Sequence, residues 1–202
     1  MLFRSAEAIA TAPGKVYLHC YLGMHRIQVV RDLLAQRGVE AGTYTVRKGE
    51  REESAVALDQ AEAHYKAGRF QEALMALGKI ETGKETESSR VLRAWSNYRS
   101  GSIAEARAAF TDVRQKHPAN TDAPIGLGYC AYRDSDYAAA ESHFQEALKA
   151  VPNNADALGG LGLSQYRAGK RTEAEQSLTA ALAVAPDNQE LREVLARLKS
   201  GV

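Results

Sequence analysis

The sequence predicts a mainly all-α protein, a solenoid of stacked helix hairpins with a small α/β segment before it. Two observations carry this prediction. The first is a period of 34 residues, which is clearest at Pro118, Pro152 and Pro186. The second is the first fifty residues, which lack this period and hold a short strand pattern followed by a helical pattern. Repeats with a period of about 20–50 residues each form one structural unit and share a continuous core with their neighbours.

Residues 1–50 are expected to fold as a helix, a strand, a loop and a second helix. The short first helix falls near residues 5–11, and the apolar residues 16–18 suit a short buried strand. The loop, residues 19–26, has the sequence HCYLGMHR, and an apolar helical pattern follows it over residues 27–38. A charged stretch then separates this segment from the repeats.

This order of elements resembles the phosphate-binding loop of cysteine-dependent tyrosine and dual-specificity phosphatases. The matching residues are His19, Cys20, Gly23 and Arg26. The resemblance implies that Cys20 is the nucleophile and that Arg26 clamps two phosphate oxygens through its planar guanidinium. A phosphate or a phosphorylated ligand is the expected occupant of residues 20–26. The residues expected to cradle it are Tyr21, Leu22, Gly23, Met24, His25 and Arg26.

The chemistry of such a loop explains its spacing. Backbone N–H groups between a strand and a helix turn toward the ligand, and the helix dipole adds partial positive charge. Both effects lower the pKa of a cysteine thiol at the start of the loop, so that its thiolate can attack phosphorus.

Two features depart from the phosphatase pattern. Ile27 stands where the family has a serine or threonine whose hydroxyl helps turnover. The family's general acid is an aspartate well upstream, but none of the 19 residues before Cys20 is aspartate. The segment therefore matches the carboxyl half of such a domain, and we expect this chain alone to lack phosphatase activity. Three origins stay open: a fragment of a longer protein, a mis-started reading frame and a decayed domain.

The repeats are predicted over residues 54–187, in four copies: 54–86, 87–120, 121–154 and 155–187. Small, aromatic and apolar positions recur at the same spacing: Ala106, Ala140 and Ala174; Tyr98, Tyr132 and Tyr166; Phe110, Phe144 and Leu178. Each copy holds two helical patterns, with a break at Gly68, Gly101, Ser135 or Gly169. Asn and Asp at the junctions suit helix starts, because their side chains can cap free N–H groups. These residues are Asn120, Asp122, Asn154 and Asp156.

The pattern resembles the tetratricopeptide repeat family. The best copy matches that family at Leu161, Gly162, Tyr166, Gly169, Ala174, Leu178, Ala181 and Pro186. The resemblance implies a right-handed α-solenoid of paired helices. Residues 188–202 then form a C-terminal cap, because Leu191, Val194, Leu195 and Leu198 share one face of an otherwise polar helical pattern.

In the family, the first helices of successive repeats line a concave groove that binds peptides. The corresponding residues here are Tyr65, Lys66, Trp95, Tyr98, Arg99, Tyr129, Tyr132, Arg133, Tyr166 and Arg167. Such an aromatic and basic surface suits an extended acidic or C-terminal peptide. An alternative stays open, in which each tyrosine packs and each basic residue is a solvated charge. Some members clamp a terminal carboxylate with asparagines, but the equivalent positions here are Glu62, Trp95, Tyr129 and Leu163, which argues against that clamp.

Composition excludes several other classes. The net charge is +1, which gives no bulk electrostatic case for nucleic acid or membrane partners. No apolar run approaches the roughly 20 residues of a membrane span. Two cysteines, far apart in the sequence, fit a reducing cytoplasm. The five histidines lack ligand spacing and no Gly-rich nucleotide loop is present, so no metal and no cofactor are expected.

The sequence therefore predicts a protein–protein interaction module that carries a truncated, inactive phosphatase-like segment. The alternative is a cysteine-dependent phosphatase whose upstream half is missing from this chain, so the question of enzyme activity stays open.

Overall fold

The computed structural model describes residues 53–200, which lie in the second of two compact units, residues 52–202. The strand, loop and helix expected within residues 1–50 lie outside the described residues. Within residues 53–200 there are nine helices and no strand, so the predicted all-α fold is confirmed for this part of the chain. The helices are α3 (Glu53–Lys66), α4 (Phe70–Leu77), α5 (Glu87–Arg99), α6 (Ile103–Lys116), α7 (Asp122–Arg133), α8 (Tyr137–Ala150), α9 (Ala155–Arg167), α10 (Arg171–Val184) and α11 (Gln189–Ser200).

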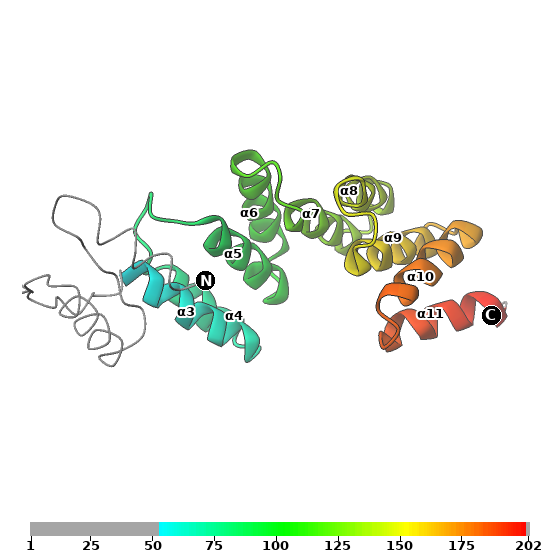
Figure 1. Ribbon diagram of the computed structural model, residues 1–202, viewed down its shortest axis with the longest axis horizontal. Helices are drawn as coiled ribbons and strands as arrows, with labels where there is room; N and C mark the ends of the chain where they lie inside the picture. The colour runs from blue at the N-terminus through cyan, green and yellow to red at the C-terminus, as the bar shows by residue number, and fades with distance from the viewer. Residues whose placement is uncertain (1–52, 201–202) are drawn as a thin grey trace, which may run out of the picture. The chain divides into compact units, whose positions relative to one another are not determined.

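The helices stack in chain order, as Figure 1 shows from α3 in cyan to α11 in red. Each helix packs mainly against the helices before and after it. The first helices of successive hairpins, α3, α5, α7, α9 and α11, also contact one another in turn. The second helices make no comparable contacts with each other among the described residues. The first helices therefore form the inner face of the stack, and the second helices form its outer face.

The turns within the hairpins use left-handed backbone at the four positions where the sequence predicted breaks. Gly68, Gly101 and Gly169 have φ angles of 73°, 90° and 78°. Ser135 has a φ angle of 63° and is the one non-glycine residue with positive φ in the described part of the chain. Only glycine adopts this conformation without steric cost, so the third hairpin turn carries some strain.

The large core side chains pack against glycines on α7 and α9. A Cβ atom at Gly126 would lie 2.2 Å from the ring of Phe110, and one at Gly160 would lie 2.3 Å from the ring of Phe144. Gly128 also lies against Phe144, where an added Cβ would be 2.8 Å from the ring. Both rings are fully buried. The rings of α6 and α8 thus press onto bare helix backbone of the following repeat, which brings neighbouring repeats close together.

A polar network joins the first two hairpins. The guanidinium of Arg90 on α5 bonds to Asp112 at 2.5 Å and to Glu85 at 2.8 Å. Arg93, one turn further along α5, donates to Glu85 at 3.2 Å and to the backbone carbonyl of Leu77 at 3.1 Å. These pairs account for the two arginines on a helix that packs between repeats, because each partly buried charge meets an acceptor.

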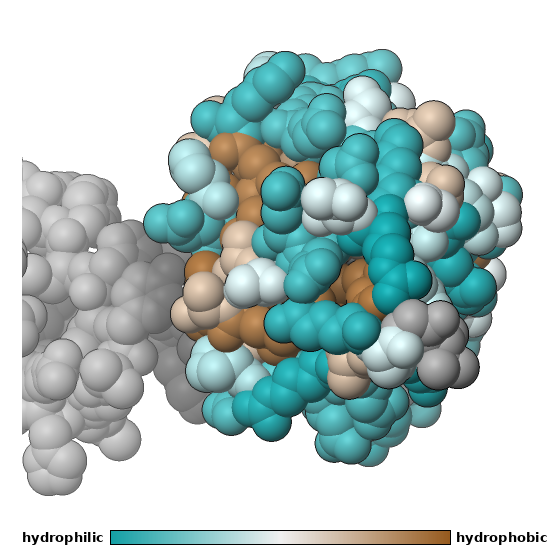
Figure 2. All heavy atoms as spheres, turned by 90° about the vertical axis from the view of Figure 1, so that its right-hand side faces the viewer, coloured by the Kyte–Doolittle hydropathy of each residue, from teal (hydrophilic) through white to brown (hydrophobic). Residues whose placement is uncertain are grey.

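Helix α11 covers the end of the apolar core. Leu191 and Leu198 are buried and pack with Leu178, Ala174 and Ala181. Figure 2 shows the side of the molecule that lies to the right in Figure 1, where apolar side chains appear only in narrow strips between hydrophilic ones. A helix with one apolar and one polar face meets the requirement for the end of such a stack.

A candidate peptide-binding groove on the first helices

The expected groove residues all lie on the first helices, which form the inner face of the stack. Their basic members are exposed and their aromatic members are half-buried. The exposed basic side chains, called the basic row below, stand at the ends of α3, α5, α7 and α9: Lys66, Arg99, Arg133 and Arg167. The placement is compatible both with ligand binding and with packing plus solvated charge.

Each arginine of the basic row interacts with an aromatic residue of the preceding repeat. Arg167 donates from Nε to the hydroxyl of Tyr132 at 3.3 Å. The guanidinium of Arg99 lies 5.4 Å from the centre of the Phe70 ring. Burial raises the pKa of Tyr98, while the Arg133 guanidinium beside it and a hydrogen bond from that group act in the opposite direction. These contacts between repeats hold the arginines in place along one line and leave their outer faces in water.

Aromatic side chains form a continuous row beside this line. Trp95 meets Phe110 edge to face at 4.9 Å between ring centres, and it meets Tyr98 at 5.9 Å and Tyr129 at 6.2 Å. Tyr129 in turn meets Phe144 at 5.1 Å. The hydroxyl of Tyr129 donates to a backbone carbonyl of α9 at 3.2 Å, and burial raises the pKa of this phenol. The row therefore links the groove surface directly to the core rings.

Acidic residues line the opposite border of the inner face, and two of them, Asp122 and Asp156, were expected to cap helices. Asp122, Asp156 and Glu190 recur every 34 residues in the first turns of α7, α9 and α11. Asp122 and Asp156 do not accept these capping bonds. Asparagines two residues earlier accept the backbone N–H bonds instead. Those caps are Asn120, Asn154 and Asn188, at 2.9, 2.9 and 3.1 Å. The same 34-residue recurrence could have revealed the acidic border from the sequence.

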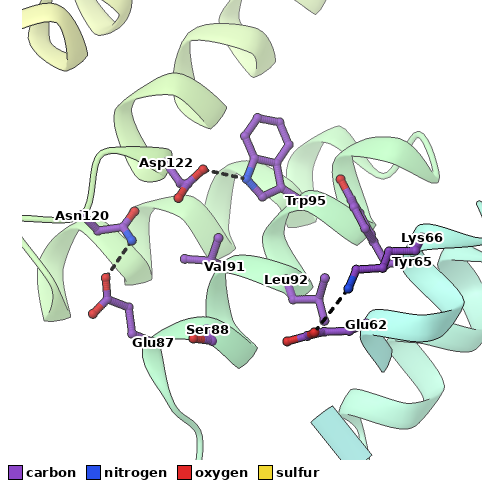
Figure 3. A pocket seen from close by; sticks show the side chains of 10 residues that line it. All are labelled: Glu62, Tyr65, Lys66, Glu87, Ser88, Val91, Leu92, Trp95, Asn120 and Asp122. Atoms are coloured by element: carbon purple, nitrogen blue, oxygen red, sulfur yellow. Dashed lines mark hydrogen bonds and ion pairs between the residues drawn. The ribbon is translucent and has the colours of Figure 1, made fainter. Parts of the chain in front are cut away.

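A hollow opens on this face between α3, α5 and the start of α7, with a volume of about 400 Å³. Figure 3 shows the side chains that converge on it from these elements. They are Glu62, Tyr65, Lys66, Glu87, Ser88, Val91, Leu92, Trp95, Asn120 and Asp122. Asp122 accepts from the indole N–H of Trp95 at 3.4 Å, and Glu87 accepts from Asn120 at 2.7 Å. The hollow thus combines an apolar floor with a charged rim.

Family models described as tetratricopeptide repeat match residues 91–155 and 131–198. The chain contains tetratricopeptide repeats. No curated protein sequence matches the chain.

Solved structures resemble the described repeats in fold. TTC0263, a tetratricopeptide repeat protein of Thermus thermophilus, has a TM-score of 0.65 at 21% identity, covering 73% of this chain and 82% of that one. MamA from Desulfovibrio magneticus RS-1 has a TM-score of 0.63 at 17% identity, covering 74% and 85%. The first repeat domain of Spaghetti (RPAP3), bound to an HSP90 peptide, has a TM-score of 0.54 at 20% identity, covering 57% and 91%. At these identities the likeness shows the fold alone.

The expected phosphate-binding loop lies outside the described residues, including Cys20 and Arg26. Cys130, within the repeats, is a buried free cysteine, and burial raises the pKa of its thiol to about 11, so it is not an activated nucleophile. Within residues 53–200, no group of His, Cys, Asp and Glu side chains could hold a metal ion. None of the helices in that range is both long and apolar enough to cross a membrane.

Proposed function

We propose that the repeats bind an extended segment of a partner protein along the inner face, with acidic side chains of that segment facing the basic row. The main support is that four basic side chains are exposed at the same repeat position on successive first helices. Contacts with the preceding repeat hold the three arginines of this row in advance, which lowers the entropy cost of binding. The peptide SRMEEVD bound to the repeat domain of Spaghetti is also acidic.

The expected affinity follows from many small contributions. One exposed arginine–carboxylate pair contributes only ~0.2–1 kcal/mol. Several such pairs, together with contacts to aromatic rings, reach micromolar affinity, which corresponds to about 8 kcal/mol. Binding should weaken with salt, because exposed charges are screened over ~10 Å at about 0.1 M ionic strength.

A selection of random twelve-residue peptides on the immobilised full chain tests this proposal. Enriched peptides should be acidic, and the double variant Arg99→Ala, Arg133→Ala should bind them far more weakly than the natural chain does. The matched control is Arg192→Ala, Arg197→Ala, which removes the same charge from α11 at the capping end. Equal losses in the two double variants, or enriched peptides without acidic residues, would show that the basic row is only solvated charge.

We propose a domain division to accompany this function: a phosphatase-like segment at residues 1–50, four repeats over residues 54–187 with the boundaries given above, and a cap at 188–202. A cytoplasmic location fits the reduced, buried Cys130. Limited proteolysis tests the division, since cleavage should concentrate between residue 39 and residue 53.

The second candidate function is anion binding at residues 20–26, favoured by the motif HCYLGMHR in the sequence. Phosphate, sulfate or vanadate should bind weakly to the full chain, and Arg26→Ala should abolish this binding. Titration without any anion binding would exclude the loop. Hydrolysis of a phosphate ester by this chain, lost in Cys20→Ser, would instead support the phosphatase alternative.

A further inference from the structure

We infer that the hollow between α3 and α5 is a binding site for a lysine or arginine side chain of the bound segment. The inference rests on the proposed function, because the hollow lies on the same inner face as the basic row. It adds a second chemical requirement, since the partner segment then carries a basic residue as well as acidic ones.

The charges at the rim are predominantly negative. Three carboxylates, those of Glu62, Glu87 and Asp122, line the hollow together with one ammonium group, that of Lys66. Lys66 forms an exposed ion pair with Glu62, with 3.9 Å between nitrogen and oxygen, and this single ammonium group does not balance three carboxylates. A cationic side chain entering the hollow would therefore meet a rim with net negative charge.

Helix-end electrostatics do not account for all of this charge. Glu87 and Asp122 stand in first turns, where a carboxylate favourably meets the helix dipole whether or not a ligand binds. Glu62, however, lies late in α3, far from the first turn in which the dipole favours a carboxylate, and its ion pair is with the exposed Lys66. Its carboxylate faces the same hollow from the opposite helix (Figure 3).

The remaining walls match the other parts of a basic side chain. Val91 and Leu92 offer apolar surface to the methylene stem, as basic residues commonly require. Tyr65 and Trp95 supply aromatic rings, which attract cations placed over their faces. The indole N–H of Trp95 holds Asp122 beside the ring at 3.4 Å, and a carboxylate retains capacity for further donors.

The position of the hollow sets the spacing within the bound segment. Packed helices lie ~8–10 Å apart, so the hollow at α3 and α5 is about 10–20 Å from the arginines of α7 and α9. An extended chain rises ~3.3 Å per residue, which places the basic residue about three to six residues from the acidic ones.

Trp95 makes the test direct, because it is the single tryptophan of the chain and lines the hollow. The probes are acetylated twelve-residue peptides in a glycine–serine background. Each holds one lysine and a block of three glutamates four residues away, in both orders. Companion peptides carry norleucine for the lysine, or glutamines for the glutamates. Binding is measured by anisotropy of labelled peptide, and Trp95 emission reports events in the hollow.

We expect the lysine peptide to bind about tenfold more tightly than its norleucine companion and to change Trp95 emission. The variant Glu62→Gln, Asp122→Asn should remove most of this difference. The control Asp156→Asn, at the equivalent position one repeat later, should keep it. Thermal unfolding confirms that each variant is folded.

The outcomes separate the inference from the proposed function. Equal binding of lysine and norleucine peptides, with loss only in the glutamine companion, overturns the inference and leaves the proposed function standing. Equal binding of the glutamate and glutamine peptides, together with weaker binding of the norleucine companion, supports the hollow and contradicts the basic row. Failure of every peptide to bind overturns both.

Discussion

Gly159 and Gly160 are neighbours on α9, yet alanine should have opposite effects at the two positions. A Cβ atom at position 160 would lie 2.3 Å from the ring of Phe144, which is fully buried. The ring cannot move freely toward α7, because Gly128 on that helix already lies against it. At position 159 the nearest atom is a terminal methyl group of Leu191 at 3.0 Å, which belongs to a flexible side chain.

The magnitudes follow from two opposing effects. Alanine in a helix interior is favoured over glycine by ~1 kcal/mol at both positions. Overpacking a rigid core costs about 1–3 kcal/mol, and the Phe144 contact lies at the upper end because it is more than 1 Å shorter than an ordinary carbon–carbon contact. Gly160→Ala should therefore lower the free energy of unfolding by about 2 kcal/mol. Gly159→Ala should leave it unchanged or raise it by up to ~1 kcal/mol.

Thermal and urea unfolding of the full chain, followed by far-ultraviolet circular dichroism, measures both changes. For a unit of this size ~1 kcal/mol shifts the Tm by about 2–4 °C, so Gly160→Ala should melt about 4–8 °C lower. Gly159→Ala serves as the matched control for helix propensity. If Gly160→Ala melts at or above Gly159→Ala, Phe144 does not pack against the backbone of α9 in solution and the argument fails.

Three further predictions use the same unfolding assay. Phe144→Ala should destabilise the repeats by ~3–5 kcal/mol, because glycine-lined helix surfaces have no side chains with which to fill the cavity; a loss below ~1 kcal/mol would contradict its core position. Ser135→Gly should raise stability by about 0.5–1 kcal/mol by relieving the left-handed strain, and an unchanged or lower Tm would contradict this. Burial, and after it the Arg114 charge, lowers the pKa of His143, so its protonation opposes folding. The contribution of neutral His143 to the free energy of unfolding is complete above the unfolded pKa of ~6.5 and is lost as the pH falls below that value toward the lower folded pKa. His143→Gln should therefore show a smaller drop in Tm between pH 7 and pH 5 than the natural chain, and an equal drop would contradict this.

Features that repeat along the chain could be predicted from the sequence, because the same residue type recurs at the same position of several repeats. The 34-residue period predicted the helix hairpins and the four turn positions, including Ser135, where the residue type alone gives no such signal. The packing of aromatic rings against the backbone at Gly126 and Gly160 was not predicted. A glycine within a helical pattern indicates lower propensity, and only the approach of Phe110 or Phe144 from the preceding repeat explains its presence.

The candidate groove could be predicted only in part, for a physical reason. Repeat geometry fixes which face a position occupies, so the shared face of Arg99, Arg133 and Arg167 followed from the period. The partner of each side chain depends on rotamers and on residues a full repeat away, as in the bond from Arg167 to Tyr132. The hollow could not be predicted, because side chains from three elements, α3, α5 and the start of α7, form it together. One of these side chains, Glu62, also belongs to the repeat copy that is one residue out of step with the others.

Opposite charges at two places on one groove would fix the register of a bound segment. With the basic row alone, an acidic peptide could shift by one repeat and meet the next arginine with little loss, because Arg99, Arg133 and Arg167 are equivalent in spacing. A basic residue seated near Glu62 and Trp95 removes this freedom, since the equivalent of the hollow one repeat later lacks both side chains: Trp95 is replaced by Tyr129, whose hydroxyl already donates to the backbone of α9. A shifted segment would leave its cation without a partner equivalent to Glu62, because Trp95 stands at that position of the next repeat. Selectivity on this groove would therefore come more from the penalty on wrong registers than from the strength of any one pair.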